Sequence, residues 1–266
     1  MEYSYNQHKL QKIKVWNYKP NQTTYIYIHG GAWRDPNWTY DQLEPVVRND
    51  NFTYIGINYR LSPDVKHPDH LIDILQALQY IKQNFEVGDL HILGYSCGAT
   101  LILQLLNFEE IIEMGLQAFG LSKTSLPDLC NLIPFIYKNI KFKSLRFLDG
   151  IYDPLELIEE YPDYSSFIEA AFVKTVVLPN REATISSIQQ STQLCGNFND
   201  IPFSLVDKDT KFIIVQSLED DLLTMSQTKC LIEYFTNKKQ PLSLNTGLYG
   251  KHNDLYGEKR RKLFIE

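Results

Sequence analysis

The chain has 266 residues, with 26 Lys and Arg against 32 Asp and Glu, which gives a formal charge of −6. Its 44% hydrophobic and 22% charged residues are typical of a globular protein and exclude a disordered or collagen-like chain. The acidic balance argues against nucleic acid or an anionic membrane as the main partner, because both attract basic surfaces.

The first half of the chain alternates predicted strands with predicted helices. β-Branched and aromatic residues predict strands at Thr23–Ile28 and Phe52–Tyr59. Pro68 opens a helical pattern. The apolar residues of that pattern share one face and are Leu71, Ile74, Leu75, Leu78 and Ile81. A short buried strand at Asp89–Leu93 then leads through a tight turn into a helical stretch, ATLILQLLNFEE.

The second half continues the alternation after one interruption. Strands are predicted at Ser144–Leu148, Lys211–Gln216 and Leu242–Leu244, with a helix ending near Asn237 and a short one from about Asp254. Strands separated by helices predict right-handed crossovers and a mostly parallel central sheet flanked by helices. The length allows one large α/β domain or two small ones, and we expect a single domain covering 1–266.

The interruption lies at approximately 151–209, where the strand and helix rhythm is lost. The segment reads IYDPLELIEEYPDYSSFIEAAF and continues into a run rich in Ser, Gln and Asn. Insertions at the carboxyl edge of a parallel sheet lie where ligands bind, so we expect a small cap or lid. A plain surface excursion is the alternative.

The strongest local motif is the G-x-S-x-G sequence at 94–98, centred on Ser96. A tight turn from a strand into a helix needs little bulk two residues either side of its nucleophile, which explains Gly94 and Gly98. The helix that follows stabilises negative charge at its N-terminus. By itself the pattern is weak, but the strand before it and the helix after it are the arrangement that an exposed nucleophile requires.

A second motif, HGGAW, follows the strand at Thr23–Ile28. Backbone N–H groups without side-chain bulk can approach a developing oxyanion. The predicted oxyanion motif comprises His29, Gly30, Gly31, Ala32 and Trp33, together with the N–H of Cys97. We expect His29 to brace this loop and not to act as the base, because it precedes the nucleophile. A simple glycine turn is the alternative.

A serine nucleophile needs a base and an orienting carboxylate. His252 is the best candidate base, because it lies in a loop after the last predicted strand. The other histidines lie in less suitable places: His8, His29, His67, His70 and His91. Three acids follow the strand at Lys211–Gln216, and Asp220 is preferred over Asp221 and Glu219. The order Ser96, Asp220, His252 is the order of an α/β hydrolase.

The four cysteines are too far apart in sequence for a CxxC motif: Cys97, Cys130, Cys195 and Cys230. The N-terminal segment MEYSYNQHKLQKIK is polar and lacks the apolar region of a secretory signal. We therefore expect cysteine thiols and a cytoplasmic protein.

These motifs together resemble the α/β-hydrolase superfamily, most closely its hormone-sensitive-lipase branch. The segments that carry the resemblance are HGGAW, YRLSP, GYSCGA, the acid loop and GKHND. More narrowly, the chain resembles the fungal kynurenine formamidases (arylformamidases) through LDGIYDPLELIEEYPDY, QSLEDDLLTMSQT and KHNDLY, with Asp35 close behind HGGAW. The similarity covers nearly the whole chain, from about Tyr25 onwards.

The resemblance implies an α/β-hydrolase fold and hydrolysis of N-formyl-L-kynurenine to L-kynurenine and formate, a step of tryptophan degradation that leads toward NAD synthesis. It implies Ser96 as nucleophile, Asp220 as acid and His252 as base, with no metal or organic cofactor. Two positions depart from the family pattern: Tyr95, where many relatives carry His, and Arg34. These departures bear on fine specificity and not on catalysis.

Two other functions remain open. One is a general short-chain carboxylesterase of the same fold, and the other is a non-catalytic binding protein built on that fold. The expected partner is a small-molecule substrate, with no nucleic acid and no membrane, and the sequence leaves a homodimer open. Tyr161, Tyr164 and Arg181 of the predicted insertion are candidates to hold the amino-acid end of the substrate.

Overall fold

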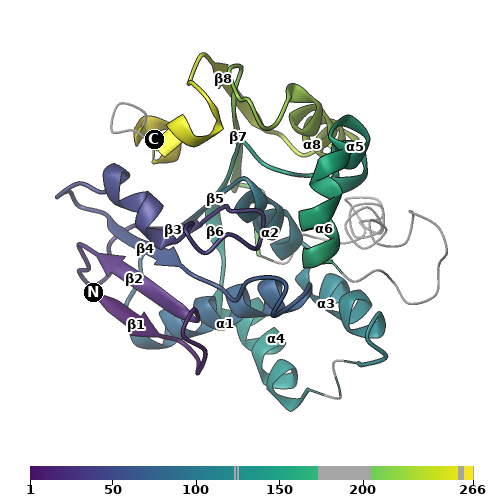
Figure 1. The fold of residues 1–266 in the computed structure, drawn as a ribbon. Coiled ribbons are helices and arrows are strands. Elements are labelled where there is room, and N and C mark those ends of the chain that lie inside the picture. Colours follow the sequence, from purple (N-terminus) through teal and green to yellow (C-terminus); the bar gives the residue numbers. More distant parts are fainter. Residues whose placement is uncertain (123, 125, 173–204, 257–260, 266) are drawn as a thin grey trace.

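One mixed sheet runs through the part of the chain that the computed structural model describes, residues 1–122, 124, 126–172, 205–256 and 261–265. Its strand order is β1-β2-β4-β3-β5-β6-β7-β8 (Figure 1). The strands are β1 Glu2–Ser4, β2 Lys12–Trp16, β3 Thr24–Ile28, β4 Thr53–Ile57, β5 Leu90–Tyr95, β6 Phe142–Leu148, β7 Lys211–Ser217 and β8 Ser243–Gly247. Strands β1 and β2 pair antiparallel at one edge, and every pairing from β4 to β8 is parallel.

Helices connect the parallel strands. The α-helices are α1 Asp69–Asn84, α2 Cys97–Leu105, α3 Phe108–Gln117, α4 Pro127–Asn139, α5 Pro154–Glu160, α6 Ser165–Ala171, α8 Met225–Asn237 and α9 Arg261–Phe264. The 3₁₀ helices of the described residues are η1 Tyr40–Val46, η3 Pro162–Tyr164 and η4 His252–Tyr256. Among the described helices, none combines the length and hydrophobicity needed to cross a lipid bilayer.

The central strands are buried on both faces, and their alternating side chains fill two separate cores. In β3, Ile26 and Ile28 belong to the larger core, which α1, α2 and α4 help to form. Tyr25 and Tyr27 of the same strand belong to the smaller core, where η1 and α9 cover the opposite face. The sheet is therefore a middle layer, as its continuous apolar strands predict.

The structure corrects the predicted elements in three places. The stretch ATLILQLLNFEE is not one helix, because Asn107 leaves the helical conformation (φ −135°, ψ 37°) and divides α2 from α3. The antiparallel strands β1 and β2 and the helix α4 were not predicted. The last strand, predicted at Leu242–Leu244, extends over Ser243–Gly247.

The parallel pairing determines where a site can form. Strands β3, β5, β6, β7 and β8 are consecutive neighbours, so their carboxyl ends meet at one edge of the sheet. The segments that follow them carry HGGAW, Ser96, Asp149, the three acids and His252. Of the predicted insertion, α5, η3 and α6 are described. Residues 173–204 lie outside the described residues, so the cap and its limits stay a prediction.

Candidate active site

Ser96 occupies the turn between β5 and α2 in a strained conformation. Its φ of 54° and ψ of −123° are unusual for a residue with a side chain, and such strain is typical of functional sites. A methyl group at Gly94 would collide with the carbonyl of Gly98, and one at Gly98 would collide with the carbonyl of Ile28. Gly94 thus allows the tight turn, as the motif predicts, and Gly98 lets the turn pack against β3.

The HGGAW loop packs directly on this turn. A methyl group at Gly30 would lie only 3.0 Å from Cβ of Ser96, so glycine is required for the contact. Gly31, Ala32 and Trp33 all have positive φ, at 96°, 51° and 57°. The Trp33 N–H donates to Sγ of Cys97 at 3.3 Å, which fixes the loop to the start of α2.

This arrangement places candidate oxyanion donors next to Ser96. Gly31 and Ala32 line the same pocket as Ser96, and Cys97 is the first residue of α2. The N–H of Trp33 donates to the Cys97 thiol, and the N–H groups of Ala32 and Cys97 also interact with that thiol. The backbone N–H groups of Gly31, Ala32 and Cys97 stay candidate oxyanion donors.

His29 is buried and serves the loop. Its Nδ1 lies 2.8 Å from the carbonyl oxygen of Gly30, and its ring stacks on Tyr59 at 4.4 Å. Burial lowers the pKa of His29 from 6.5 to about 4. It does not line the pocket with Ser96. These contacts agree with a bracing function for His29.

Asp220 contacts the imidazole ring of His252. Its Oδ2 lies 2.7 Å from Nδ1 of His252, and the two side chains are only 1% and 5% exposed. Its Oδ1 accepts hydrogen bonds from the backbone N–H groups of Leu222 and Leu223, each at 2.8 Å. The carboxylate is thus held by its own loop with one oxygen aimed at the ring, as an orienting acid requires.

The two neighbouring acids bind the backbone of the same histidine loop. Asp221 accepts a hydrogen bond from the N–H of His252 at 3.2 Å, and this bond lowers the pKa of Asp221. Glu219 accepts one from the N–H of Gly250 at 2.8 Å. All three acids therefore position the loop of His252, but only Asp220 reaches the ring.

Three further residues support the histidine loop, and this function was not predicted from the sequence. The hydroxyl of Tyr95 donates to the carbonyl of His252 at 2.6 Å. Asp149, at the end of β6, accepts the N–H of Ser217 at 2.8 Å, and the Ser217 hydroxyl donates to the carbonyl of Gly250 at 2.5 Å. Their position at the ends of neighbouring strands is the signal that could have identified them.

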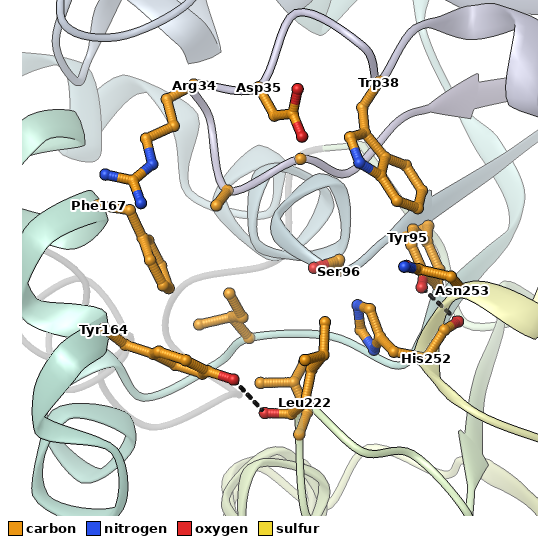
Figure 2. A pocket seen from close by; sticks show the side chains of 14 residues that line it. Arg34, Asp35, Trp38, Tyr95, Ser96, Tyr164, Phe167, Leu222, His252 and Asn253 are labelled. Carbon is orange, nitrogen blue, oxygen red and sulfur yellow. Dashed lines mark hydrogen bonds between the residues drawn. The ribbon is translucent and has the colours of Figure 1, made fainter.

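A pocket of about 360 Å³ opens beside Ser96 and His252 (Figure 2). Its lining is mainly apolar and aromatic, and consists of Gly31, Ala32, Arg34, Asp35, Trp38, Tyr95, Ser96, Ile151, Tyr164, Phe167, Leu222, Leu223, His252 and Asn253. Within the described residues, no hydrogen bond joins the side chains of Ser96 and His252. Such bonds often form only when a substrate binds. The site can therefore perform nucleophilic attack by an activated serine once those groups come together.

Of the three residues of the predicted insertion that were candidates to hold the substrate, the structure places one in the pocket. Tyr164 lines the pocket and donates to the carbonyl of Leu222 at 3.2 Å. Tyr161 stacks on Tyr164 at 5.0 Å and is not among the lining residues. Arg181 lies outside the described residues.

Within the described part of the chain, one cluster of side chains has the composition of a metal site. Donor atoms of Asp149, Asp220 and His252 lie within 4.8 Å of one another. However, Asp220 and His252 are only 2.7 Å apart, which is a hydrogen-bond distance. Two ligands at roughly 2.0–2.2 Å from one ion in tetrahedral geometry would stand farther apart. The cluster fits the hydrogen-bonded pair better than a metal centre.

Comparison with known proteins gives matches over almost the whole chain. The kynurenine formamidase of Scheffersomyces stipitis is 42% identical over 261 residues, which cover 95% of this chain and 92% of that protein. The kynurenine formamidase of Saccharomyces cerevisiae is 30% identical, with 87% and 82% covered. The BD-FAE family matches residues 16–124.

Solved structures with low sequence identity share the fold. Esterase B from Lactobacillus rhamnosis aligns with a TM-score of 0.62 at 18% identity, covering 96% of this chain and 77% of that one. MGS-M1, an α/β hydrolase from a Medee basin deep-sea metagenome, aligns with a TM-score of 0.53 at 12% identity, covering 95% and 82%. The fold is therefore that of the α/β hydrolases.

Proposed function

The chain belongs to the kynurenine formamidase family, and from that premise we propose that it hydrolyses N-formyl-L-kynurenine to L-kynurenine and formate, a step of tryptophan degradation that leads toward NAD synthesis. The observation that carries the proposal is the 2.7 Å contact between Asp220 and the His252 ring, in the pocket that Ser96 lines. In the proposed enzyme, Ser96 is the nucleophile, His252 the base and Asp220 the orienting acid.

The first half of the reaction transfers the formyl group to the enzyme. His252 removes the proton of the Ser96 hydroxyl as the serine oxygen attacks the formyl carbonyl. Backbone N–H groups of Gly31, Ala32 and Cys97 stabilise the tetrahedral oxyanion. One such donor lowers the activation barrier by about 3–4 kcal/mol. The C–N bond then breaks, and protonated His252 gives its proton to the leaving aryl amine.

The second half releases the formyl group from Ser96. Neutral His252 removes a proton from a water molecule, and the resulting hydroxide attacks the formyl-serine ester. The ester bond breaks, the serine oxygen regains its proton from His252, and formic acid leaves and ionises to formate, releasing one proton to the solvent. Asp220 stabilises the imidazolium that forms in each half.

The lining of the pocket suits an aromatic amide. Trp38, Tyr95, Tyr164 and Phe167 surround the space beside Ser96 (Figure 2). Trp38 stacks on Tyr95 at 5.7 Å, and Tyr164 packs against Phe167 at 5.3 Å. Rings held in this way bury a flat substrate by stacking and by apolar contact.

A general carboxylesterase would use the same residues, so substrate preference tests the proposal. Steady-state kinetics should give a higher kcat/KM for N-formyl-L-kynurenine than for p-nitrophenyl esters of short acids. If an ester has much the higher value, the formamidase assignment is wrong and the esterase alternative holds.

A non-catalytic binding protein on this fold would lack an activated serine. Labelling with a fluorophosphonate tests this alternative directly, because the reagent modifies a serine that a base has activated. We expect labelling at Ser96 that disappears in Ser96→Ala. Absence of labelling in the unmodified protein would favour the binding protein.

The other expectations from the sequence stay proposals. We expect a cytoplasmic enzyme that needs neither metal nor organic cofactor, so dialysis against a chelator should leave the rate unchanged. The homodimer that the sequence leaves open would be tested by light scattering of the purified protein.

A further inference from the structure

The charges at the mouth of the active-site pocket are unevenly distributed. Most of the lining residues are apolar or aromatic, and Arg34 is the only lysine or arginine among those that the structure describes. It follows the HGGAW loop directly, two positions after Ala32. Figure 2 shows its guanidinium beside Phe167, on the side of the pocket opposite His252, with Ser96 between them.

The guanidinium of Arg34 is held in place without being neutralised. It lies over the ring of Phe167, with Cζ 5.6 Å from the ring centroid, and Nη1 donates to the hydroxyl of Ser166 at 3.4 Å. Neither partner is an anion. Among the described residues no carboxylate lies within the 4.0 Å ion-pair distance of this side chain, in contrast to Arg60, which pairs with Asp73 at 2.7 Å.

The neighbouring acid does not occupy Arg34 either. Asp35 lines the same pocket, but its Oδ1 accepts hydrogen bonds from the backbone and side-chain nitrogens of Asn37, each at 2.9 Å. These bonds tie Asp35 to its own turn. Arg34 therefore keeps most of its five donors for a ligand, in the planar geometry that suits a carboxylate.

We propose that Arg34 determines specificity by binding the α-carboxylate of the substrate while the formyl group lies against Ser96. This inference rests on the proposed function, because N-formyl-L-kynurenine carries its aryl formamide at one end and an amino-acid carboxylate at the other. The formamide end needs His252 and the oxyanion loop. The carboxylate end then extends toward Phe167, where Arg34 supplies the positive charge that an apolar pocket would otherwise lack.

The test compares two substrates that differ only in this carboxylate. One is N-formyl-L-kynurenine, and the other is its decarboxylated amine, which keeps the aryl formamide, the ketone and the amino group. Each is measured with the unmodified enzyme, Arg34→Gln, Arg34→Lys and the control Lys66→Gln. Lys66 contacts the carbonyl of Glu169 in α6, near Phe167, but does not line the pocket.

If Arg34 contacts the carboxylate, removing the guanidinium from the enzyme and removing the carboxylate from the substrate must have effects on kcat/KM that are not additive. In Arg34→Gln, kcat/KM for N-formyl-L-kynurenine should fall about ten- to hundredfold, the loss expected for one charge-assisted hydrogen-bonded contact. The loss should appear mainly in KM, because the contact is the same in the ground and transition states. For the decarboxylated amine, the same substitution should change kcat/KM less than twofold. Arg34→Lys should recover part of the loss, and Lys66→Gln should behave like the unmodified enzyme.

Other outcomes overturn the inference in distinguishable ways. Equal losses on both substrates would mean that Arg34 supports the pocket and does not bind the carboxylate. Unchanged kinetics in Arg34→Gln would remove Arg34 from recognition altogether, while the proposed function stands. If the unmodified enzyme cleaves esters but neither formamide, the proposed function fails and this inference fails with it. Fluorophosphonate labelling at Ser96 shows that the variants keep a working site.

Discussion

At the level of single residues, the sequence predicts which residue types form the candidate triad better than it predicts which acid contacts the histidine ring. The order of Ser96, Asp220 and His252 follows from the positions of the strands. Choosing among three consecutive acids is harder, because one residue of register along the loop decides which side chain meets the ring. The structure gives each acid a separate partner in the histidine loop.

This division of contacts predicts different costs for two neighbouring substitutions. Asp220→Asn should lower kcat by about 10³–10⁴-fold, because the imidazole loses the carboxylate that fixes its tautomer and stabilises its cation. Asp221→Asn keeps an oxygen that can accept the N–H of His252 and removes only the charge that pairs with the exposed Lys251 at 3.3 Å, so it should cost less than about tenfold. Both rates would be measured on N-formyl-L-kynurenine at pH 7.

The two variants serve as controls for each other, since they differ by one position in the same loop. Comparable losses in both would show that Asp220 acts only by holding the loop. A larger loss of kcat in Asp221→Asn than in Asp220→Asn would identify Asp221 as the orienting acid.

At the level of the elements, the central strands were predicted because their β-branched and aromatic residues are continuous. The strands β1 and β2 were missed because they are short and half-exposed, although Ile13 and Val15 alternate inward in β2. The break at Asn107 was missed because apolar residues continue on both sides of it. Periodicity detects an amphipathic face, but it does not detect one non-helical residue within an apolar segment.

The packing of the turn against β3 predicts that Gly98 cannot carry a side chain. Gly98→Ala would push a methyl group into the carbonyls of Ile28 and His29. We expect the free energy of unfolding to fall by about 1–3 kcal/mol or more. The activity should fall at least tenfold, because the oxyanion loop and Ser96 are forced apart. Urea unfolding and steady-state kinetics would measure the two effects.

Gly120→Ala is the matched control, since among the described residues, apart from its chain neighbours, no atom lies within 4 Å of the position where its methyl group would stand. It has a φ of +70°, so a cost of about 1–2 kcal/mol from backbone strain alone is expected, with kcat unchanged. If Gly98→Ala retains full activity, the close contact between the turn and β3 does not matter for catalysis.

At the level of the whole molecule, three buried histidines make stability depend on pH. Burial lowers the pKa of His29 to about 4 and the pKa values of His67 and His70 to about 3, from 6.5. Below pH 6.5 the unfolded chain therefore binds more protons than the folded protein. The free energy of unfolding should fall with decreasing pH, by up to about 1.4 kcal/mol per pH unit for each histidine.

Urea denaturation between pH 7.5 and 5 would measure this slope in a range where few carboxylates titrate in the unfolded chain. His67→Gln should reduce the dependence of the free energy of unfolding on pH by about the contribution of one histidine, because Nε2 of His67 is buried without a described partner. A stability that stays constant or increases as the pH falls from 6.5 to 5 would contradict the neutral state of these residues.

The net charge of −6 carries little information about the substrate. The pocket that selects it is largely apolar, and its lining residues come from segments far apart in the sequence. Their convergence depends on five neighbouring parallel strands, which is a property of the fold and not of any single motif. The alternation of strands and helices therefore predicted the fold class, while specificity required the three-dimensional arrangement.

The central claim is that Ser96 deformylates N-formyl-L-kynurenine. The most direct measurement is the formation of L-kynurenine and formate by the purified protein and by Ser96→Ala at equal concentration. We expect stoichiometric release of both products by the unmodified protein and a loss of about 10³-fold or more in the variant, with the fold retained by circular dichroism. Deformylation by Ser96→Ala at a rate near that of the unmodified protein would contradict the serine mechanism.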